Sequence, residues 1–270
     1  MRHLASLGVI LLLLPAACLA QDENHACDFR RPQYCAVNVA HDQVGIWSSP
    51  SRIKGHDLLW IVPLAAVTGV AIHYDARAMQ QLGSNPNTLS TARSISNWGA
   101  IYVPLGTVGI GYLAGVEKHD DHLRRTAMLA GEAMLDGLLL DEGLKYVTNR
   151  ERPDVGEYRG EFWAHGYGSY PNGRSFPSGH SALAWSFAHV IADEYPHWWT
   201  SLAVYGLAGS VTVTRVIARQ HFPSDVIVGS TFGYLVGGYV YRHHDPNARH
   251  ALNVTPLASP GTLGLAISFR

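Results

Sequence analysis

Six apolar segments, separated by polar stretches, limit what this chain can fold into. Each is long enough for three or more turns of helix. They cover residues 58–72, 99–116, 127–147, 181–192, 198–214 and 226–241. Two of them carry glycine at every fourth residue, which would place small side chains along one side of a helix for close packing. The pattern predicts six helices in one domain, and therefore an all-α fold.

The first twenty residues have the layout of a secretory signal peptide. A basic start precedes a short apolar core, and the small residue Ala20 is followed by polar residues. We therefore expect residues 1–20 to be removed on export. The alternative, lipid attachment at Cys18, matches less well, because Pro15 stands where lipoprotein signals usually have an aliphatic residue.

Two cysteines, Cys27 and Cys35, remain in the expected mature chain. In an oxidising compartment such a close pair is expected to form a disulfide, whereas both thiols would stay free if the chain were not exported. No linker, repeat or low-complexity segment divides the rest of the sequence. The mature chain is assigned to three parts: an N-terminal extension (21–56), one helical domain (57–245) and a C-terminal tail (246–270).

The charge balance argues against a nucleic-acid partner, because the formal net charge is only −1. Charged residues make up 15% of the chain, and glycine, alanine and valine are abundant. This composition is typical of helices that pack tightly together or lie against a membrane.

Polar residues of functional interest are concentrated in three blocks. The first, KYVTNRERP, contains Lys145 and Arg152, which would lie on one helical face two turns apart if the helix persisted. Pro153 favours an extended backbone at Arg152 and an end to the helix there. Alone, this block is better explained by basic residues that stabilise the C-terminal end of a helix dipole.

The second block, SFPSGH, precedes an apolar segment. Gly179 permits close backbone approach, and Ser178 can cap the helix or donate its hydroxyl. Free N–H groups at a helix N-terminus attract anions, so this block predicts an anion site with His180 at its edge. The alternative is an ordinary helix cap beside a surface histidine.

The third block, TRVIARQHFPSD, contains Arg215, His221 and Asp225. Pro223 suits the first position of a helix, which would place Asp225 in the first turn, four residues after His221. There the carboxylate would accept the Nδ1 proton of His221 and leave Nε2 free as a nucleophile. Alternatively, Asp225 only balances the helix dipole.

Together the blocks supply the groups that phosphoryl transfer without a metal requires. Arginine and lysine would stabilise the charge on oxygen, while one imidazole attacks and the other protonates the leaving oxygen. The sequence contains no cluster of carboxylates or cysteines suited to a catalytic metal. We therefore expect neither a metal nor another cofactor.

The pattern K-x6-R-P, then P-S-G-H, then S-R-x5-H-x3-D resembles the type 2 phosphatidic acid phosphatase (PAP2) superfamily. That superfamily includes bacterial class A acid phosphatases, lipid phosphate phosphatases and vanadium haloperoxidases. Spacing and order are kept here, and the one departure is Thr214 in place of serine, which retains a hydroxyl. The resemblance implies a six-helix bundle with the active site at the helix ends.

For the individual residues, the resemblance implies a metal-independent phosphatase. His221 would attack phosphorus to form a phosphohistidine, Asp225 would orient it, and His180 would protonate the leaving oxygen and later activate water. The residues expected to hold the phosphoryl oxygens are Lys145, Arg152, Ser178, Gly179 and Arg215. The substrate would be a phosphorylated small molecule or lipid, and the sequence does not distinguish the two.

Two other functions fit the same blocks. A vanadate-dependent haloperoxidase would use the same residues, although such enzymes are much longer. A non-catalytic helical protein of the cell envelope would carry the blocks without using them.

The sequence gives mixed signals about the membrane. Its longest uncharged runs approach the length that crosses a bilayer, but one apolar segment carries four acidic residues: Glu132, Asp136, Asp141 and Glu142. If the signal is cleaved, three successive spans would place Lys145 and Arg152 at the cytoplasmic face. We therefore expect a periplasmic or secreted domain, with membrane association possible. The alternative is an integral inner-membrane protein with an outward-facing site.

A histidine-rich stretch lies near the end of the chain. His243, His244 and His250 would supply metal ligands, but no helical or hairpin spacing fixes the three together, so a solvated tail is expected. The residues from 252 onward are more strand-like than helical.

Overall fold

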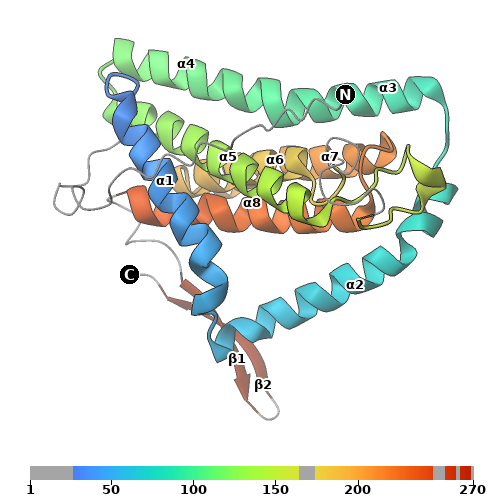
Figure 1. The fold of residues 1–270 in the computed structure, drawn as a ribbon. Helices are drawn as coiled ribbons and strands as arrows, with labels where there is room; N and C mark the ends of the chain where they lie inside the picture. The colour runs from blue at the N-terminus through green and yellow to red at the C-terminus, as the bar shows by residue number, and fades with distance from the viewer. Residues whose placement is uncertain (1–26, 164–173, 246–252, 260–261, 269–270) are drawn as a thin grey trace, which may run out of the picture.

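The computed structural model describes residues 27–163, 174–245, 253–259 and 262–268. The predicted signal peptide and His250 lie outside the described residues. Within them the chain forms eight α-helices and one β-hairpin (Figure 1). The elements are α1 (Pro32–Ser48), α2 (Leu58–Gln81), α3 (Pro86–Asn97), α4 (Val103–Glu117), α5 (Asp121–Thr148), α6 (Gly179–Glu194), α7 (Trp198–Ile217), α8 (Pro223–His244), β1 (Asn253–Ser259) and β2 (Thr262–Ser268).

Short helical turns join several of these elements. A π-helical turn, Trp98–Tyr102, links α3 to α4, so that the two run end to end along one edge of the molecule (Figure 1). Three 3₁₀ turns complete the helical structure: Ser49–Arg52, Gly55–Asp57 and Gly156–Tyr158.

The predicted helical bundle is confirmed, with differences at its edges. The six predicted segments correspond to α2 and to α4 through α8. Two helices, α1 and α3, were not predicted. The strand-like ending forms an antiparallel hairpin, in which Asn253 pairs with Ser268 and Ser259 with Thr262.

The core lies where α5, α6 and α8 pack against one another, with α1 and α4 on the outside of α5 (Figure 1). Its buried side chains include Ala133, Phe187, Val190 and Val240. The predicted glycine seam on α8 faces α6. A Cβ atom at Gly229 would lie 2.5 Å from the carbonyl oxygen of Ser178, so the two backbones approach as closely as glycine allows.

Capping residues define the ends of the helices that carry the site. Asp120 begins α5 by accepting a hydrogen bond from the N–H of Leu123 at 3.0 Å. Asn149 ends it in the left-handed region, with φ 40°, a conformation that asparagine tolerates. Pro223 occupies the first turn of α8, as predicted, and Asp225 lies in the same turn.

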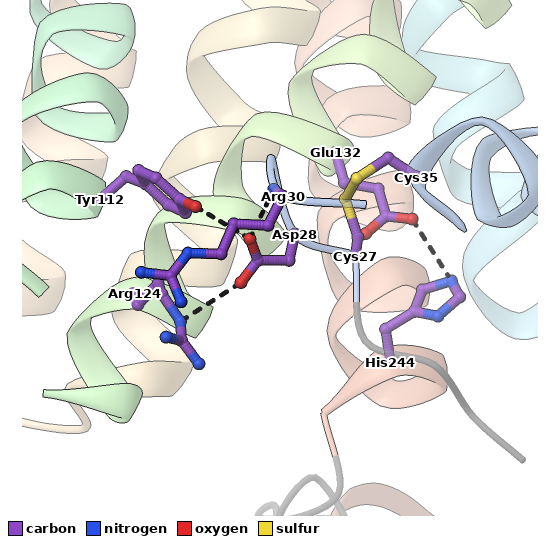
Figure 2. The surroundings of a disulfide bond; sticks show 8 residues. All are labelled: Cys27, Asp28, Arg30, Cys35, Tyr112, Arg124, Glu132 and His244. Carbon is purple, nitrogen blue, oxygen red and sulfur yellow. Dashed lines mark hydrogen bonds and ion pairs between the residues drawn. A yellow bond between two sulfur atoms is a disulfide. The ribbon is translucent and has the colours of Figure 1, made fainter. Parts of the chain in front are cut away.

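The disulfide predicted between Cys27 and Cys35 is present, with an S–S distance of 2.05 Å. It packs beside Tyr112 and the start of α5. Figure 2 shows Asp28 next to it, accepting a hydrogen bond from the Tyr112 hydroxyl at 2.9 Å and facing Arg124. The disulfide therefore fixes the N-terminal end of α1 against the bundle.

Three stretches within the described residues are long and apolar enough to cross a membrane: Gly55–Gln81, Pro86–Glu117 and Trp198–Ile217. Many of their large apolar side chains are exposed, including Trp60, Val70, Ile110, Leu113 and Leu202. Such wide apolar exposure is unusual for a surface that faces water. It supports association of the chain with a membrane.

Candidate active site

The predicted site residues gather at one end of the bundle, where α5 and α7 end and α6 and α8 begin. Lys145 and Arg215 lie in the last turns of α5 and α7, and Asp225 lies in the first turn of α8. The N–H of Ser178, at the start of α6, donates to the carbonyl oxygen of Asp225 at 3.0 Å. The structure thus brings the residues predicted for the site together at the helix ends.

His221 is buried, with 1% of its surface exposed, in the loop before α8. Its Nδ1 lies 2.7 Å from the carbonyl oxygen of Ser175. Because a carbonyl only accepts hydrogen bonds, Nδ1 carries the hydrogen and the lone pair is on Nε2. Burial lowers the pKa of His221 to about 4, so the imidazole is neutral at physiological pH.

The carboxylate of Asp225 is not the nearest acceptor for His221. Its Oδ2 lies 3.6 Å from His221 Nδ1, within ion-pair distance but beyond a good hydrogen bond. Oδ2 instead accepts from the Ser175 hydroxyl and, at 2.8 Å, from the N–H of Phe222. Asp225 therefore holds the loop on both sides of the imidazole. We expected its carboxylate to accept the Nδ1 proton of His221, but the Ser175 carbonyl accepts that proton instead.

Arg150 anchors Asp225 from the other side. Its guanidinium is buried and bonds Asp225 Oδ1 at 2.6 Å and Asp75 Oδ2 at 2.7 Å. It also donates to the Ser224 hydroxyl at 2.7 Å and lies over the ring of Phe222. Burial alone would raise the pKa of Asp225, but its hydrogen bonds and the Arg150 charge hold that pKa below its usual value.

His180 points toward α3. Its Nε2 lies 3.0 Å from Oδ1 of Asn97, at the end of α3. Asn97 Oδ1 also lies 3.5 Å from Nη1 of Arg215. Burial, together with the positive charges around it, Arg215 above all, lowers the pKa of His180 to about 3.

Two of the three predicted cations have donors to spare. The Nε atoms of Arg152 and Arg215 are buried and have no hydrogen-bond partner among the described residues. The other recorded bonds of Arg152 and Arg215 are long, at 3.4 Å to Gln220 and 3.4 Å to Ser96. Buried arginine donors without acceptors favour the binding of an anion.

Lys145 differs from the two arginines because it is already paired. Its Nζ lies 2.6 Å from Asp141 and 3.0 Å from Glu142. Gly179 lies directly against this pair: a Cβ atom there would be 2.6 Å from Asp141 Oδ2 and 3.1 Å from Lys145 Nζ. Glycine is therefore required if α6 is to begin this close to Lys145.

The structure corrects two local expectations. The helix does not persist to Arg152, because α5 ends at Thr148 and Asn149 turns the chain, so Lys145 and Arg152 do not share a helical face. Ser178 occupies the N-cap position of α6, but its side chain makes no capping bond; its hydroxyl accepts from Ser181 at 3.1 Å.

Four contributors to the site were not predicted: Asp75, Asn97, Arg150 and the carbonyl of Ser175. Arg150 lies inside the first block, two residues before Arg152, and this second arginine in the block is the feature that could have pointed to it. Asp75 and Asn97 come from helices that carry no block, and a backbone carbonyl leaves no trace in a sequence. No spacing rule would have found these three.

The arrangement combines the neutral imidazole of His221, whose tautomer is fixed, with a second imidazole, that of His180. It also contains three cations, of which Lys145 is paired with carboxylates while Arg152 and Arg215 keep unused donors. Asp141, Asp225 and Asp75 are each paired with lysine or arginine, so the positive groups are held in place by carboxylates. These groups suit the binding of a tetrahedral oxyanion whose central atom is attacked by Nε2 of His221.

A family model matches the part of the chain that carries the three blocks. It describes the PAP2 superfamily and covers residues 126–249, from the start of α5 beyond the end of α8. The match, which covers less than half of the 270 residues, shows that this part of the chain is similar to the PAP2 superfamily. Its limits enclose every site residue predicted from the resemblance, whereas α1 to α4 lie before it.

Two lipid A 1-phosphatases are similar in sequence. The one from Porphyromonas gingivalis is 27% identical over 183 residues, which cover 67% of this chain and 37% of that protein. The one from Rhizobium etli is 35% identical over 107 residues, which cover 40% of this chain and 45% of that protein. The chain thus spans less than half the length of either relative.

Two solved structures resemble the fold. Aquifex aeolicus LpxE is 21% identical, with a TM-score of 0.46, and the match covers 60% of this chain and 89% of that chain. A transmembrane PAP2-type phosphatidylglycerolphosphate phosphatase from Bacillus subtilis is 20% identical, with a TM-score of 0.47, covering 78% and 94%.

Proposed function

We propose that this protein is a phosphatase that hydrolyses a lipid phosphate through a phosphohistidine at His221. One observation carries the proposal. A buried, neutral imidazole with its lone pair on Nε2 lies close enough to Arg152 and Arg215 for their charges to lower its pKa, and both guanidinium groups have unused buried donors. A phosphoryl group satisfies these donors while presenting phosphorus to Nε2.

The chemistry then proceeds in two displacements. Nε2 of His221 forms a bond to phosphorus as the ester P–O bond breaks, and His180 gives its proton to the departing oxygen. In the second step His180 takes a proton from water, whose oxygen attacks phosphorus and releases phosphate and neutral His221. The phosphoryl oxygens are held by Arg152, Arg215 and Lys145, which supply the positive charge in both steps.

His180 must hold a proton when substrate is bound, although nearby cations lower its pKa in the free site. A bound phosphate dianion brings two negative charges among those cations. The same electrostatics that lower the pKa of His180 would then raise it, so substrate binding itself prepares the acid.

A lipid is the favoured form of the ester for two reasons. The apolar, exposed stretches also carry site residues: Asp75 lies on α2, Asn97 at the end of α3 and Arg215 at the end of α7. The relatives matched in sequence are named as lipid A 1-phosphatases. A phosphate carried on a membrane lipid would reach this site along the surface of those helices.

An apolar cavity of about 1220 Å³ lies among α1, α2, α5 and α8. At one end it is lined by Leu144, next to Lys145, and Val228, one turn after Asp225. Its other end is bordered by Arg52 and Arg242. A cavity of this size and character would accommodate acyl chains close to the phosphate site.

The test is phosphate release by the purified protein in detergent with EDTA present. A soluble aryl phosphate and a lipid phosphate in mixed micelles are compared, with His221→Ala as the control. We expect turnover of the lipid to exceed turnover of the soluble ester, and both to disappear in the variant. Inertness toward every phosphate ester would overturn the proposal, and preference for the soluble ester would overturn its lipid part.

A further inference from the structure

A second polar cluster lies at the end of the bundle opposite the candidate active site. It consists of Asp42 from α1, Glu132 and Asp136 from α5, and His244 at the end of α8. Glu132 precedes Lys145 by thirteen residues, or about 20 Å along the helix. The expectation that His244 belongs to a solvated tail is therefore wrong: its ring is packed against two buried carboxylates from other helices.

The ligand atoms of three residues converge on one point. A carboxylate oxygen of Asp42, one of Glu132 and a ring nitrogen of His244 all lie within 4.8 Å of one another. His244 Nε2 is 2.8 Å from Asp42 Oδ2 and 3.9 Å from Glu132 Oε1. Ligand atoms around a metal with bonds of about 2.1 Å lie about 3 to 4 Å apart, so only small side-chain movements are needed.

The cluster has unmet bonding capacity. The Glu132 side chain is 2% exposed, and neither of its oxygens has a hydrogen bond of normal geometry within the described residues. Oδ2 of Asp136, which is also fully buried, likewise has no hydrogen bond of normal geometry within the described residues. Buried carboxylate oxygens without donors are costly, and a cation would satisfy them.

A neighbouring amide holds one of these carboxylates in place. Gln43 donates to Asp136 Oδ1 at 2.8 Å and to the Asp136 carbonyl oxygen at 3.2 Å. The orientation of the Gln43 amide is set by Trp47, whose Nε1 donates to Gln43 Oε1 at 3.1 Å. Asp136 is thus fixed with Oδ2 left over, the kind of outer support found around metal ligands.

We propose that Asp42, Glu132 and His244 bind one divalent transition-metal ion, with Asp136 beside them as a further oxygen donor. One imidazole with two or three carboxylates matches Zn²⁺, whereas Ca²⁺ prefers oxygen ligands alone. The ion would join α1, α5 and α8 at a point where the chain is also held by the disulfide. Figure 2 shows Glu132 and His244 near Cys27 and Cys35.

The test uses the full mature chain in detergent, purified without a histidine tag and freed of metal by chelation and dialysis. Zn²⁺ and Ca²⁺ are each titrated alone by calorimetry, and Tm is measured with and without each ion. We expect one equivalent of Zn²⁺ to bind, Tm to rise with Zn²⁺, and Ca²⁺ to bind at least tenfold more weakly.

Three variants locate the site. His244→Ala and Glu132→Gln should lose the bound equivalent and the Tm response. The matched control, His243→Ala, removes a neighbouring exposed histidine that stacks on Tyr239 and should keep both. Without metal, Glu132→Gln should be at least as stable as the wild type, because it removes a buried negative charge.

Two results would overturn the proposal. One is wild-type protein that neither binds Zn²⁺ nor gains Tm. The other is Zn²⁺ binding that survives in both His244→Ala and Glu132→Gln, which would place the ion elsewhere. The first result needs only the wild-type protein. The proposal can therefore still be refuted if a variant fails to fold.

Discussion

The Nδ1 atom of His221 lies 2.7 Å from the carbonyl oxygen of Ser175, nearer than any oxygen of Asp225 recorded beside it. The loop before α6 therefore fixes the tautomer of the imidazole through its backbone. Asp225 contributes indirectly, since it binds the Ser175 hydroxyl and the Phe222 N–H on either side of the ring. The carboxylate positions the loop that positions the histidine.

This division of roles predicts unequal effects of two substitutions. His221→Ala should lower kcat at least 10³-fold, because it removes the attacking nitrogen. Asp225→Asn should lower kcat only about 10- to 100-fold, because the Ser175 carbonyl still fixes the tautomer. Rates on a lipid phosphate, measured below the Tm of each variant, check the order, and equal losses would mean that Asp225 sets the tautomer after all.

The contact between Asn97 and His180 predicts a dependence on the leaving group. Asn97→Ala removes the acceptor 3.0 Å from His180 Nε2 and should misplace the acid. Protonation matters most for poor leaving groups, so kcat on an alkyl phosphate should fall about tenfold, while kcat on a nitrophenyl phosphate changes little. Ser94→Ala, an exposed change on the same helix, is the control. An equal loss on both esters would refute a role through His180.

The low pKa of His221 predicts how activity and stability depend on pH. The imidazole is neutral above about pH 4, so protonation of the nucleophile should lower kcat/KM only below about that pH. In the unfolded chain the same histidine binds a proton below about pH 6.5. Between these values the unfolded state binds more protons, so stability should decrease as the pH falls from 6.5 to 4.

The matching variant is His221→Gln, which cannot take up a proton there. Its Tm should fall less steeply over the same pH range than that of the wild type. Parallel slopes for the two proteins would show that His221 is not a buried neutral group. Circular dichroism melts at half-unit pH intervals are sufficient for the comparison.

The helices that the sequence left unpredicted are those without an apolar stripe. The buried residues of α1 are Asp42 and Ile46, and those of α3 are Ala92 and Ser96. A search for apolar runs passes over both. For α3 a different signal was present: Asn85 caps the helix by accepting from the N–H of Asn87, and proline follows it directly. The Asn85–Pro86 pair, a common start of a helix, would have predicted α3 although its hydropathy pattern did not.

The site was predictable where its residues lie in short blocks and unpredictable where it depends on distant contacts. The spacing from Arg215 to Asp225 is local, so a single loop brings those residues together. By contrast, Arg150 binds both Asp75 and Asp225, and each of these two residues is 75 positions away from it in the sequence. Asn97 reaches His180 only because α3 packs along α7. Such contacts follow from the packing of helices and not from their order.

The close approach of Gly179 to the lysine pair predicts a further difference between variants. Gly179→Ala would place a methyl group 2.6 Å from Asp141 Oδ2 and 3.1 Å from Lys145 Nζ, so the pair must move. We expect kcat/KM to fall tenfold or more. Gly206→Ala, on α7 with open space around the new atom, should leave kcat/KM unchanged. Full activity in Gly179→Ala would mean that Lys145 does not need its present position.

The disulfide and the site lie at opposite ends of α5, and this predicts how the chain sits in a membrane. The disulfide packs near Ala127 and the site includes Lys145, eighteen residues or about 27 Å along the helix. That distance approaches the thickness of a bilayer's hydrocarbon core, and α4, part of one of the three apolar stretches, packs against α5. A bundle that crosses the membrane would hold its two ends in different compartments.

Single cysteines at exposed positions test this arrangement. Lys118→Cys marks the disulfide end and Asp154→Cys marks the site end, each introduced with Cys18→Ala so that the new residue is the one cysteine outside the Cys27–Cys35 disulfide. With a membrane-impermeant maleimide on intact cells, we expect one of the two to be labelled and not both. Labelling at Lys118→Cys alone would place the disulfide outside, as its oxidation requires, and the site inside. Labelling at Asp154→Cys alone would place the site outside and predicts that Cys27 and Cys35 are reduced in the cell. Labelling at both would mean that the bundle does not cross the membrane and that its apolar helices insert from one side.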